Sequence, residues 1–309
     1  MPMRSDRSTP EPLGPSSLAW RYFSDWRGML VGLWAGSMQN MHPGLGAGVE
    51  EHSRFFDERW ERLFRSLYPI AGVLYDGPHA ARTAREVRDY HLGIKGMDRQ
   101  GRPYHALDPD TFFWAHATFV MVPVLVCQHF GRPLTEEQKE QLYAEGLQWY
   151  RLYGVSDRPA AADWRGFCAY FDRVCVEVLE DNWATRAVLN LRRIGKPPAL
   201  GWLPDAIWCV IRVPLTRSFV WLTVGMYPPA VRARLGYRWS RRSALALWLL
   251  GRAVALGWHL VPFERRYHPR ARAAWQRARG LSVPPVETPR RNLPPLERRG
   301  DPKHYAPDV

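Results

Sequence analysis

The most constraining feature of this chain is the apolar run at residues 110–130 (DTFFWAHATFVMVPVLVCQHF). The run has the length of a membrane-spanning helix, so its polar and helix-breaking residues decide where it lies. It contains Pro123, which disturbs helical hydrogen bonding, and His116, whose ring needs a hydrogen-bond partner when it is buried. We therefore expect a buried helix of a globular domain rather than a free membrane span.

Helix-like segments separated by proline and glycine make up most of the remaining chain. Thr135 and Gln138 have the spacing of a capping box, which predicts a helix running to about residue 153. Asp163 is placed to cap a long helix that continues to Arg193. Further helices are expected at residues 18–40, 57–74, 79–95 (with Gly96 as the C-cap), 203–225 and 244–263.

The run His42–Gly48 (HPGLGAG) is rich in glycine and is expected to form a turn. Its glycine spacing is not that of a dinucleotide-binding loop, and no alternating strand precedes it. Strand signals are almost absent from the chain. The sequence therefore predicts an all-α fold.

Length and composition fit one globular domain with polar ends. The chain has 309 residues, of which 46% are hydrophobic and 24% are charged. We expect a disordered N-terminus at residues 1–18, a helical domain at 19–279 and a disordered Pro/Arg-rich tail at 280–309. The first 18 residues contain no apolar core of a signal peptide, so a cytoplasmic protein is expected.

The positive charge is concentrated in the last third of the chain. Residues 203–309 carry 19 basic and 6 acidic residues, which accounts for the whole net charge of +13. Interleaved Trp and Leu residues allow two interpretations: a peripheral contact with an anionic membrane surface, or a solvated basic face plus a polar tail. Nucleic acid is not expected as a partner, because no nucleic-acid-binding motif accompanies the charge.

Several common catalytic and metal-binding motifs are absent from the sequence. None of the four cysteines belongs to a Cys-x-x-Cys pair or a Cys-x-x-Cys-His motif, so a haem in this chain would not be thioether-linked. There is no Glu-x-x-His, His-Glu-x-x-His, P-loop or Gly-x-Ser-x-Gly motif. These absences exclude the usual signatures of di-iron bundles, zinc proteases, P-loop enzymes and α/β-hydrolases.

Two of the histidines within the expected helices, His91 and His116, are candidate site residues. His91 has Arg88 one turn before it, an arrangement that suits an axial iron ligand with a cation for a haem propionate. A capping or exposed histidine near a helix end fits the same pattern. His116 lies among aromatic residues, and three roles stay open for it: metal ligand, distal hydrogen-bond donor or core histidine.

A polar cluster is expected on the helix at residues 57–74. Offsets of three and four place Arg62, Arg65 and Ser66 on one face, where they could bind an oxyanion or polarise dioxygen. The alternative is a solvated outer face, because Glu58 and Glu61 are spaced to pair with the two arginines.

Between Trp26 and Arg193 the chain resembles the rubber oxygenase (latex-clearing protein) and MpaB-type oxygenase family. Three sequence blocks in the same order carry this resemblance. They are His42-Pro43, Gly48-Val49, His52-Ser53 and Arg62-x-x-Arg65-Ser66; then Val87-Arg88-x-x-His91 with Gly101–Tyr104; and then Trp114–Thr118.

The resemblance implies a globin-like helical bundle that holds non-covalent haem b. The family's axial histidine maps to His91, with Arg88 beside it. The basic and hydroxyl pair of the rubber-cleaving members maps to Arg65 and Ser66, with Arg62 one turn earlier. The family's acidic base has no clean match here, and the nearest carboxylates are Glu50 and Glu51. His116 and His42 belong to shared blocks and are expected near the cofactor.

We therefore expect a haem b-dependent oxygenase that combines dioxygen with an apolar, unsaturated or terpenoid substrate. The cofactor would perform the oxidation while the protein orients the reactants. Two alternatives from other classes are a haem-binding or haem-sensing protein without turnover, and a non-catalytic helical protein of the membrane surface.

Overall fold

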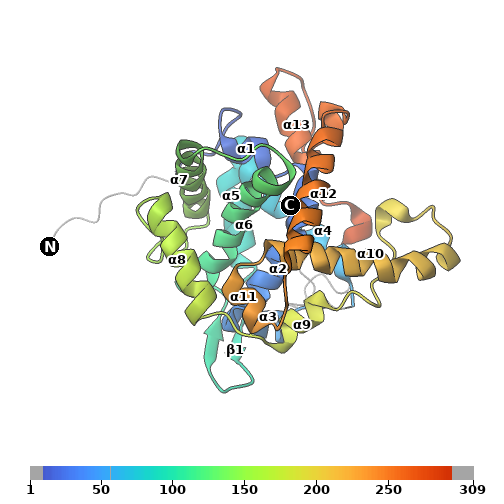
Figure 1. Cartoon of the computed structure of the whole chain (residues 1–309). Coiled ribbons are helices and arrows are strands. Elements are labelled where there is room, and N and C mark those ends of the chain that lie inside the picture. The colour runs from blue at the N-terminus through green and yellow to red at the C-terminus, as the bar shows by residue number, and fades with distance from the viewer. Residues whose placement is uncertain (1–9, 56, 294–309) are drawn as a thin grey trace.

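The computed structural model describes residues 10–55 and 57–293, and this part of the chain is mainly helical (Figure 1). It contains thirteen α-helices and two short strands. They are α1 (Leu18–Tyr22), α2 (Met29–Asn40), α3 (Pro43–His52), α4 (Arg59–Tyr75), α5 (Ala80–Asp89), β1 (Lys95–Met97), β2 (Pro103–His105), α6 (Pro109–Phe130), α7 (Glu136–Leu152), α8 (Trp164–Glu177), α9 (Trp183–Leu189), α10 (Asp205–Met226), α11 (Pro229–Arg234), α12 (Arg241–Trp258) and α13 (Pro269–Ala278). The prediction of an all-α fold is confirmed in that the described residues are mainly helical.

The apolar helix α6 lies in the core, as expected. It packs against α2, α7 and α12, and its most apolar stretch is 78% buried. Its N-terminus is capped by Asp108, whose side chain accepts a hydrogen bond from the Thr111 amide. The indole of Trp114 is fully buried and donates to the carbonyl of Met38 at 3.0 Å, which ties α6 to α2.

Two predicted helix starts are confirmed, but one predicted helix is too long. The capping box of Thr135 and Gln138 opens α7, and Asp163 caps α8. The predicted helix from Asp163 to Arg193 is wrong, because α8 ends at Glu177 and a new helix, α9, begins after Asn182. The Asn182 side chain caps α9 and also donates to the carbonyl of Asn40 at 2.7 Å, so the interruption docks this segment onto α2.

The prediction of a glycine-rich turn at residues 42–48 is wrong, because Pro43 opens helix α3. Proline is compatible with the first position of a helix, where its missing N–H costs nothing. A Cβ atom at Gly46 would lie 2.6 Å from the carbonyl oxygen of Asn40 and 2.7 Å from the amide nitrogen of Asn182. Glycine is needed there because α3 approaches its neighbours closely.

The predicted helix over residues 79–95 is wrong in its second half. Helix α5 ends at Asp89, a turn follows, and β1 pairs antiparallel with β2, with Gly96 opposite Tyr104. Gly96 is therefore a strand residue rather than a C-cap. The hairpin packs on α3. Such tertiary contacts can stabilise strands in segments whose local sequence does not predict them.

Both ends of the described chain pack on the helical body beyond the expected domain limits of 19 and 279. Leu13, Thr288 and Asn292 are buried. The disorder expected at residues 1–18 and 280–309 falls partly on residues 1–9 and 294–309, which lie outside the described residues.

Among the described residues, two helices are long and apolar enough to cross a membrane, α6 and α10. The two helices differ in burial: the most apolar stretch of α6 is 78% buried, whereas that of α10 is only 28% buried. Helix α10 projects from the body, and α12 lies along the side of α6 (Figure 1).

Candidate functional site

His91 lies in the turn that follows α5, one turn beyond Val87. Its Nδ1 atom is 2.7 Å from the carbonyl oxygen of Val87, and the edge of its ring meets Phe112, with ring centroids 5.9 Å apart. A carbonyl can only accept, so Nδ1 carries the proton and the lone pair is on Nε2. Burial, aided by the positive charge of Arg62, lowers the pKa of His91 to about 4, although the hydrogen bond to Val87 opposes this shift. The imidazole is therefore neutral at neutral pH.

Arg62 and Ser66 of α4 belong to the same neighbourhood as His91. The guanidinium of Arg62 donates to the hydroxyl of Ser66, and that hydroxyl lies 3.1 Å from the backbone carbonyl of Arg62. Because the charge of Arg62 lowers the pKa of His91, the guanidinium lies within electrostatic reach of the imidazole. The structure thus brings together three predicted site residues from two sequence blocks.

Arg65 takes a different direction from Arg62 and Ser66. Its side chain is 1% exposed, pairs with Glu58 at 2.6 Å and donates to the carbonyl of Asn292 at 3.0 Å. Arg62, Arg65 and Ser66 were expected to act together on one face of α4, but Arg65 has separate partners. Arg65 ties the start of α4 to the C-terminal segment, a contact between residues more than 200 positions apart.

Glu50 and Glu51 lie on the last turn of α3 and face the β-hairpin. Glu50 pairs with Arg99, whose Nε atom donates to it at 2.8 Å, while Glu51 accepts from the hydroxyl of Tyr104. Burial and the Glu51 carboxylate raise the pKa of Tyr104, so the phenol keeps its proton. The partners of both carboxylates are on the hairpin rather than at His91.

His116 has the environment of a core histidine. It is 2% exposed, its Nε2 atom is 2.8 Å from the carbonyl of Gly146, and its ring packs on Trp149 and Tyr150 at centroid distances of 4.7 and 5.1 Å. Burial lowers its pKa to about 4. Within the described residues, its buried Nδ1 atom has no hydrogen-bond partner.

The side chains of His42 and Arg88 have surroundings other than the His91 ring, although the Arg88 carbonyl accepts from the His91 amide. His42 precedes α3 at its N-cap, and burial lowers its pKa to about 4 although Asp108, Asp110 and Glu180 are near enough to oppose that shift. Arg88 pairs with Asp89 at 2.6 Å and donates to the carbonyl of Tyr153 at 3.3 Å. Arg88 thus joins the end of α5 to the end of α7.

Sequence reasoning did not predict four contacts of the predicted residues. The Val87 carbonyl and the Phe112 ring define the position of His91, whereas Arg99 and Tyr104 engage Glu50 and Glu51. Val87 was already part of the second sequence block, four residues before His91, which is the spacing of neighbours on a helix, but the contact of its carbonyl with the imidazole was not predicted. The hairpin partners carried no such signal, since the hairpin itself was not expected.

The donor chemistry at His91 fits a haem iron. Among the described residues there is no cluster of three or more His, Cys, Asp or Glu side chains that could hold a metal ion. A haem needs no such cluster, because the porphyrin supplies four ligands and the protein supplies an axial one. A neutral imidazole with Nδ1–H directed at a backbone carbonyl, as at the partly buried His91, is the usual form of such a ligand.

One comparison with known proteins gives a match. The sequence profile of a family described as "ER-bound oxygenase mpaB/B'/Rubber oxygenase, catalytic domain" matches residues 20–256. No curated protein and no solved structure matches the chain significantly. The match includes α4, the His91 turn, α10 and most of α12, so it is longer than the stretch from 26 to 193 that carries the resemblance in sequence.

Proposed function

The chain belongs to the mpaB and rubber oxygenase catalytic-domain family, and from this premise we propose that it is a haem b-dependent oxygenase. The substrate class we propose is apolar, unsaturated or terpenoid, with dioxygen as co-substrate. The observation that carries the proposal is the partly buried, neutral His91, whose Nδ1–H donates to the Val87 carbonyl and whose Nε2 lone pair can serve an iron.

Each residue near His91 has a proposed task. His91 would hold the cofactor, and the Val87 carbonyl fixes the imidazole in the tautomer that presents Nε2. Bound haem supplies the activation of dioxygen that no amino-acid side chain can provide. Arg62 and Ser66 would supply hydrogen-bond donors beside it, because a fixed cation stabilises negative charge that develops on oxygen. Phe112, whose ring contacts His91 and packs on Tyr150 and Tyr153, would offer an apolar substrate an aromatic surface.

A haem-binding protein without turnover is the second candidate, and a colourless helical protein of the membrane surface is the third. Purified protein separates the third from the others, because haem gives a Soret absorption band. We expect a coloured protein, or a colourless one that binds added haemin with one-to-one stoichiometry. Failure to bind haemin would contradict the proposed function.

Replacing Arg62 with alanine is expected to lower turnover at least about tenfold while haem content stays near normal, because a removed donor stabilises developing charge rather than holding the cofactor. Oxygen uptake would be measured with farnesol or squalene, whichever the wild-type protein oxidises. Arg82→Ala, which removes an exposed arginine of α5, is the control and should leave uptake unchanged. Normal uptake by the Arg62 variant would favour a solvated role for Arg62, whereas no uptake by the haem-loaded wild-type protein would favour the haem-binding alternative.

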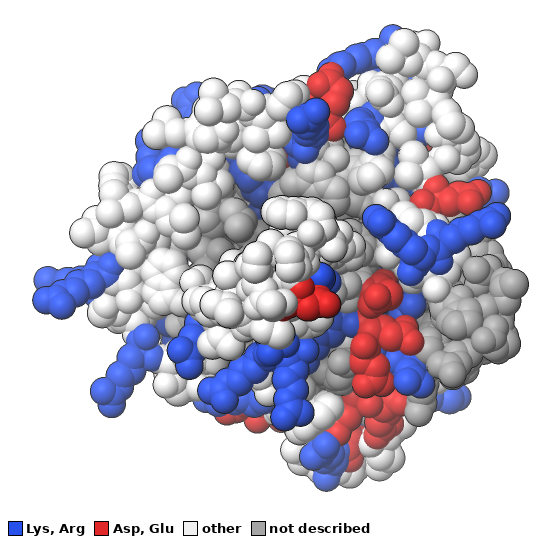
Figure 2. All heavy atoms as spheres, turned by 90° about the vertical axis from the view of Figure 1, so that its right-hand side faces the viewer, with Lys and Arg blue, Asp and Glu red and all other residues white. Residues whose placement is uncertain are grey.

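We also propose that the protein lies at the cytoplasmic side of an anionic membrane through α10 and α12. Large apolar side chains stand exposed on both helices; Val210 is 75%, Trp248 59% and Leu256 71% exposed. Seen from the side toward which α10 projects, the surface has a broad uncharged area with Lys and Arg along its margin (Figure 2). Apolar residues bordered by basic ones suit an anionic lipid surface.

Fewer aromatic side chains are exposed for membrane contact than the sequence of residues 203–279 led us to expect. Trp208 is buried, Trp221 packs on Trp239 at a centroid distance of 5.6 Å, and Trp275 packs on Trp20 at the same distance. These rings complete the protein core. Trp248 remains as an exposed aromatic residue on α12.

Vesicle co-sedimentation tests the proposed surface. The full-length protein should bind vesicles of phosphatidylcholine with phosphatidylserine at low salt and lose most binding at high salt, because salt screens the attraction of Arg to anionic lipid. Leu256→Asp should weaken binding about tenfold, since it removes an inserted apolar side chain. Leu281→Asp, at an exposed leucine outside both helices, should change little. Equal binding to neutral vesicles, or none to either, would contradict the surface.

A further inference from the structure

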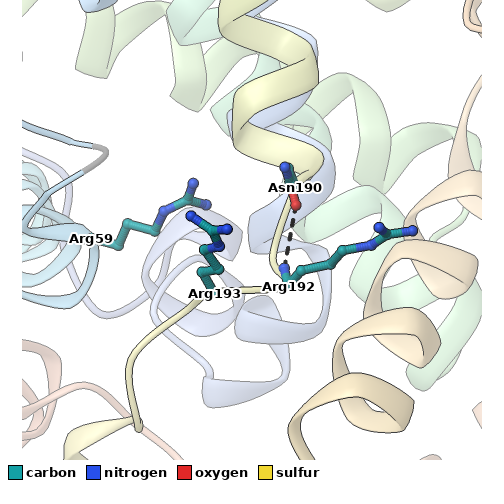
Figure 3. A pocket seen from close by; sticks show the side chains of 4 residues that line it. All are labelled: Arg59, Asn190, Arg192 and Arg193. Carbon is teal, nitrogen blue, oxygen red and sulfur yellow. Dashed lines mark hydrogen bonds between the residues drawn. The ribbon is translucent and has the colours of Figure 1, made fainter.

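A basic hollow lies between the start of α4 and the loop that follows α9. Its volume is about 430 Å³, and it is lined by Arg59, Asn190, Arg192 and Arg193. The guanidinium groups of Arg59 and Arg193 point toward each other across it, while Arg192 extends to the other side (Figure 3). Three guanidinium groups and one amide line a space with no carboxylate among its lining residues.

The loop that carries two of these arginines is held in place from both sides. The indole of Trp60, next to Arg59 on α4, donates to the carbonyl of Gly195 at 2.8 Å. Lys196 donates to the carbonyl of Leu203 at 2.6 Å and pairs with Asp205 at 2.8 Å. The side-chain oxygen of Asn190 accepts from the Arg192 amide at 3.4 Å (Figure 3). The hollow is therefore built by tertiary contacts.

The electrostatics of the hollow favour an anion. Within the described residues, neither Arg192 nor Arg193 has a carboxylate within the 4.0 Å of an ion pair. Arg59 donates to the carbonyl of Ala187 at 3.1 Å, and burial lowers the pKa of its guanidinium. Guanidinium groups that converge repel one another, and an oxyanion between them would replace that repulsion with charge-assisted hydrogen bonds. Arg59 is also the first residue of α4, where the helix dipole favours negative charge.

We propose that this hollow binds a phosphate group, either of a soluble phosphate-bearing molecule or of a phospholipid headgroup. A guanidinium presents paired N–H donors that match the oxygens of phosphate, and a phosphate carries enough charge to engage several arginines. The volume suits a diphosphate or a headgroup as well as a single phosphate. The site is separate from His91 in residues and in chemistry, so it does not depend on haem.

The position of the hollow beside the start of α10 is compatible with both sources of phosphate. The loop from Arg192 leads directly into α10, and Trp202 on the way is 77% exposed. If α10 rests on a membrane, a lipid headgroup would lie close to the loop. A soluble ligand would enter the same hollow from solvent.

Two probes applied to the purified full-length protein test the site. The first is inorganic pyrophosphate, followed by calorimetric titration; the second is phosphatidylcholine vesicles with and without phosphatidate, followed by co-sedimentation. We expect saturable binding of at least one probe, weakened about tenfold in Arg193→Gln because a charge-assisted contact is removed, and weakened less in Arg192→Gln because that guanidinium extends away from the other two (Figure 3). Arg165→Gln is the matched control, since Arg165 is an exposed arginine of α8 outside the hollow.

The pattern across probes identifies the source. Pyrophosphate binding that depends on Arg193, with vesicle binding that does not, indicates a soluble ligand. Vesicle binding that depends on Arg193 and is competed by pyrophosphate indicates a headgroup. If neither probe binds, or if Arg165→Gln weakens binding as much as Arg193→Gln, the proposal is wrong. Soret absorption should be equal in all variants, so a loss of haem would instead reveal misfolding.

Discussion

His91→Ala is expected to abolish haem retention, with loss of the Soret band and no one-to-one binding of added haemin. The reason is that the proposed axial bond comes from one imidazole, held by a 2.7 Å contact between its Nδ1 atom and the Val87 carbonyl. A methyl group at position 91 supplies neither a ligand nor the polar contact. Haem content per protein chain, measured after gel filtration, gives the result.

His129→Ala is the matched control for this prediction. His129 lies in the last turn of α6 and is outside the group formed by His91, Arg62 and Ser66. Its replacement should leave haem content unchanged. If His91→Ala kept full haem occupancy and an unaltered spectrum, His116 would become the leading ligand candidate, because its buried Nδ1 atom lacks a partner among the described residues.

The second large effect is expected at Gly251, where α12 crosses the end of α6. A Cβ atom at this position would overlap the backbone carbonyl oxygen of His129, which cannot rotate away as a side chain could. Gly251→Val should therefore separate the two helices and lower the free energy of unfolding by about 3 kcal/mol. For a chain of 309 residues we expect the melting temperature to fall by roughly 5 °C.

Gly257→Ala is the control on the same helix. Nothing lies within 4 Å of a Cβ atom added at Gly257, so alanine should raise helix stability by up to about 1 kcal/mol. Thermal unfolding followed by circular dichroism compares the two variants with the wild-type protein. A Gly251 variant as stable as the wild type would mean that α12 does not pack on α6 as described.

Local sequence predicted the elements whose signals lie within one helix. The apolar run of α6, the Thr135 capping box of α7 and the Asp163 cap of α8 each depend on neighbours a few residues away. Such signals survive folding because a cap satisfies its own helix end, and a long apolar face has no stable alternative to burial.

Tertiary structure decided the rest. Gly46 allows a helix where the glycine-rich sequence indicated a turn, because the chain can approach Asn40 and Asn182 only without a side chain. The β-hairpin forms against α3, and its residues Arg99 and Tyr104 then become the partners of Glu50 and Glu51. None of these contacts is visible in a single segment.

At the candidate site, too, some features followed from local sequence and others only from the tertiary structure. The sequence selected Arg62, Ser66 and His91 as chemically capable residues, and helical spacing correctly joined the first two. Spacing also grouped Arg65 with them, but its ion pair with Glu58, seven residues earlier, and its hydrogen bond to the distant Asn292 turned that side chain away. Residue type and helical period are local properties of the chain, so the sequence by itself determined them. The direction of a buried charge depends on which distant partner can offset its desolvation, and only the folded chain decides that.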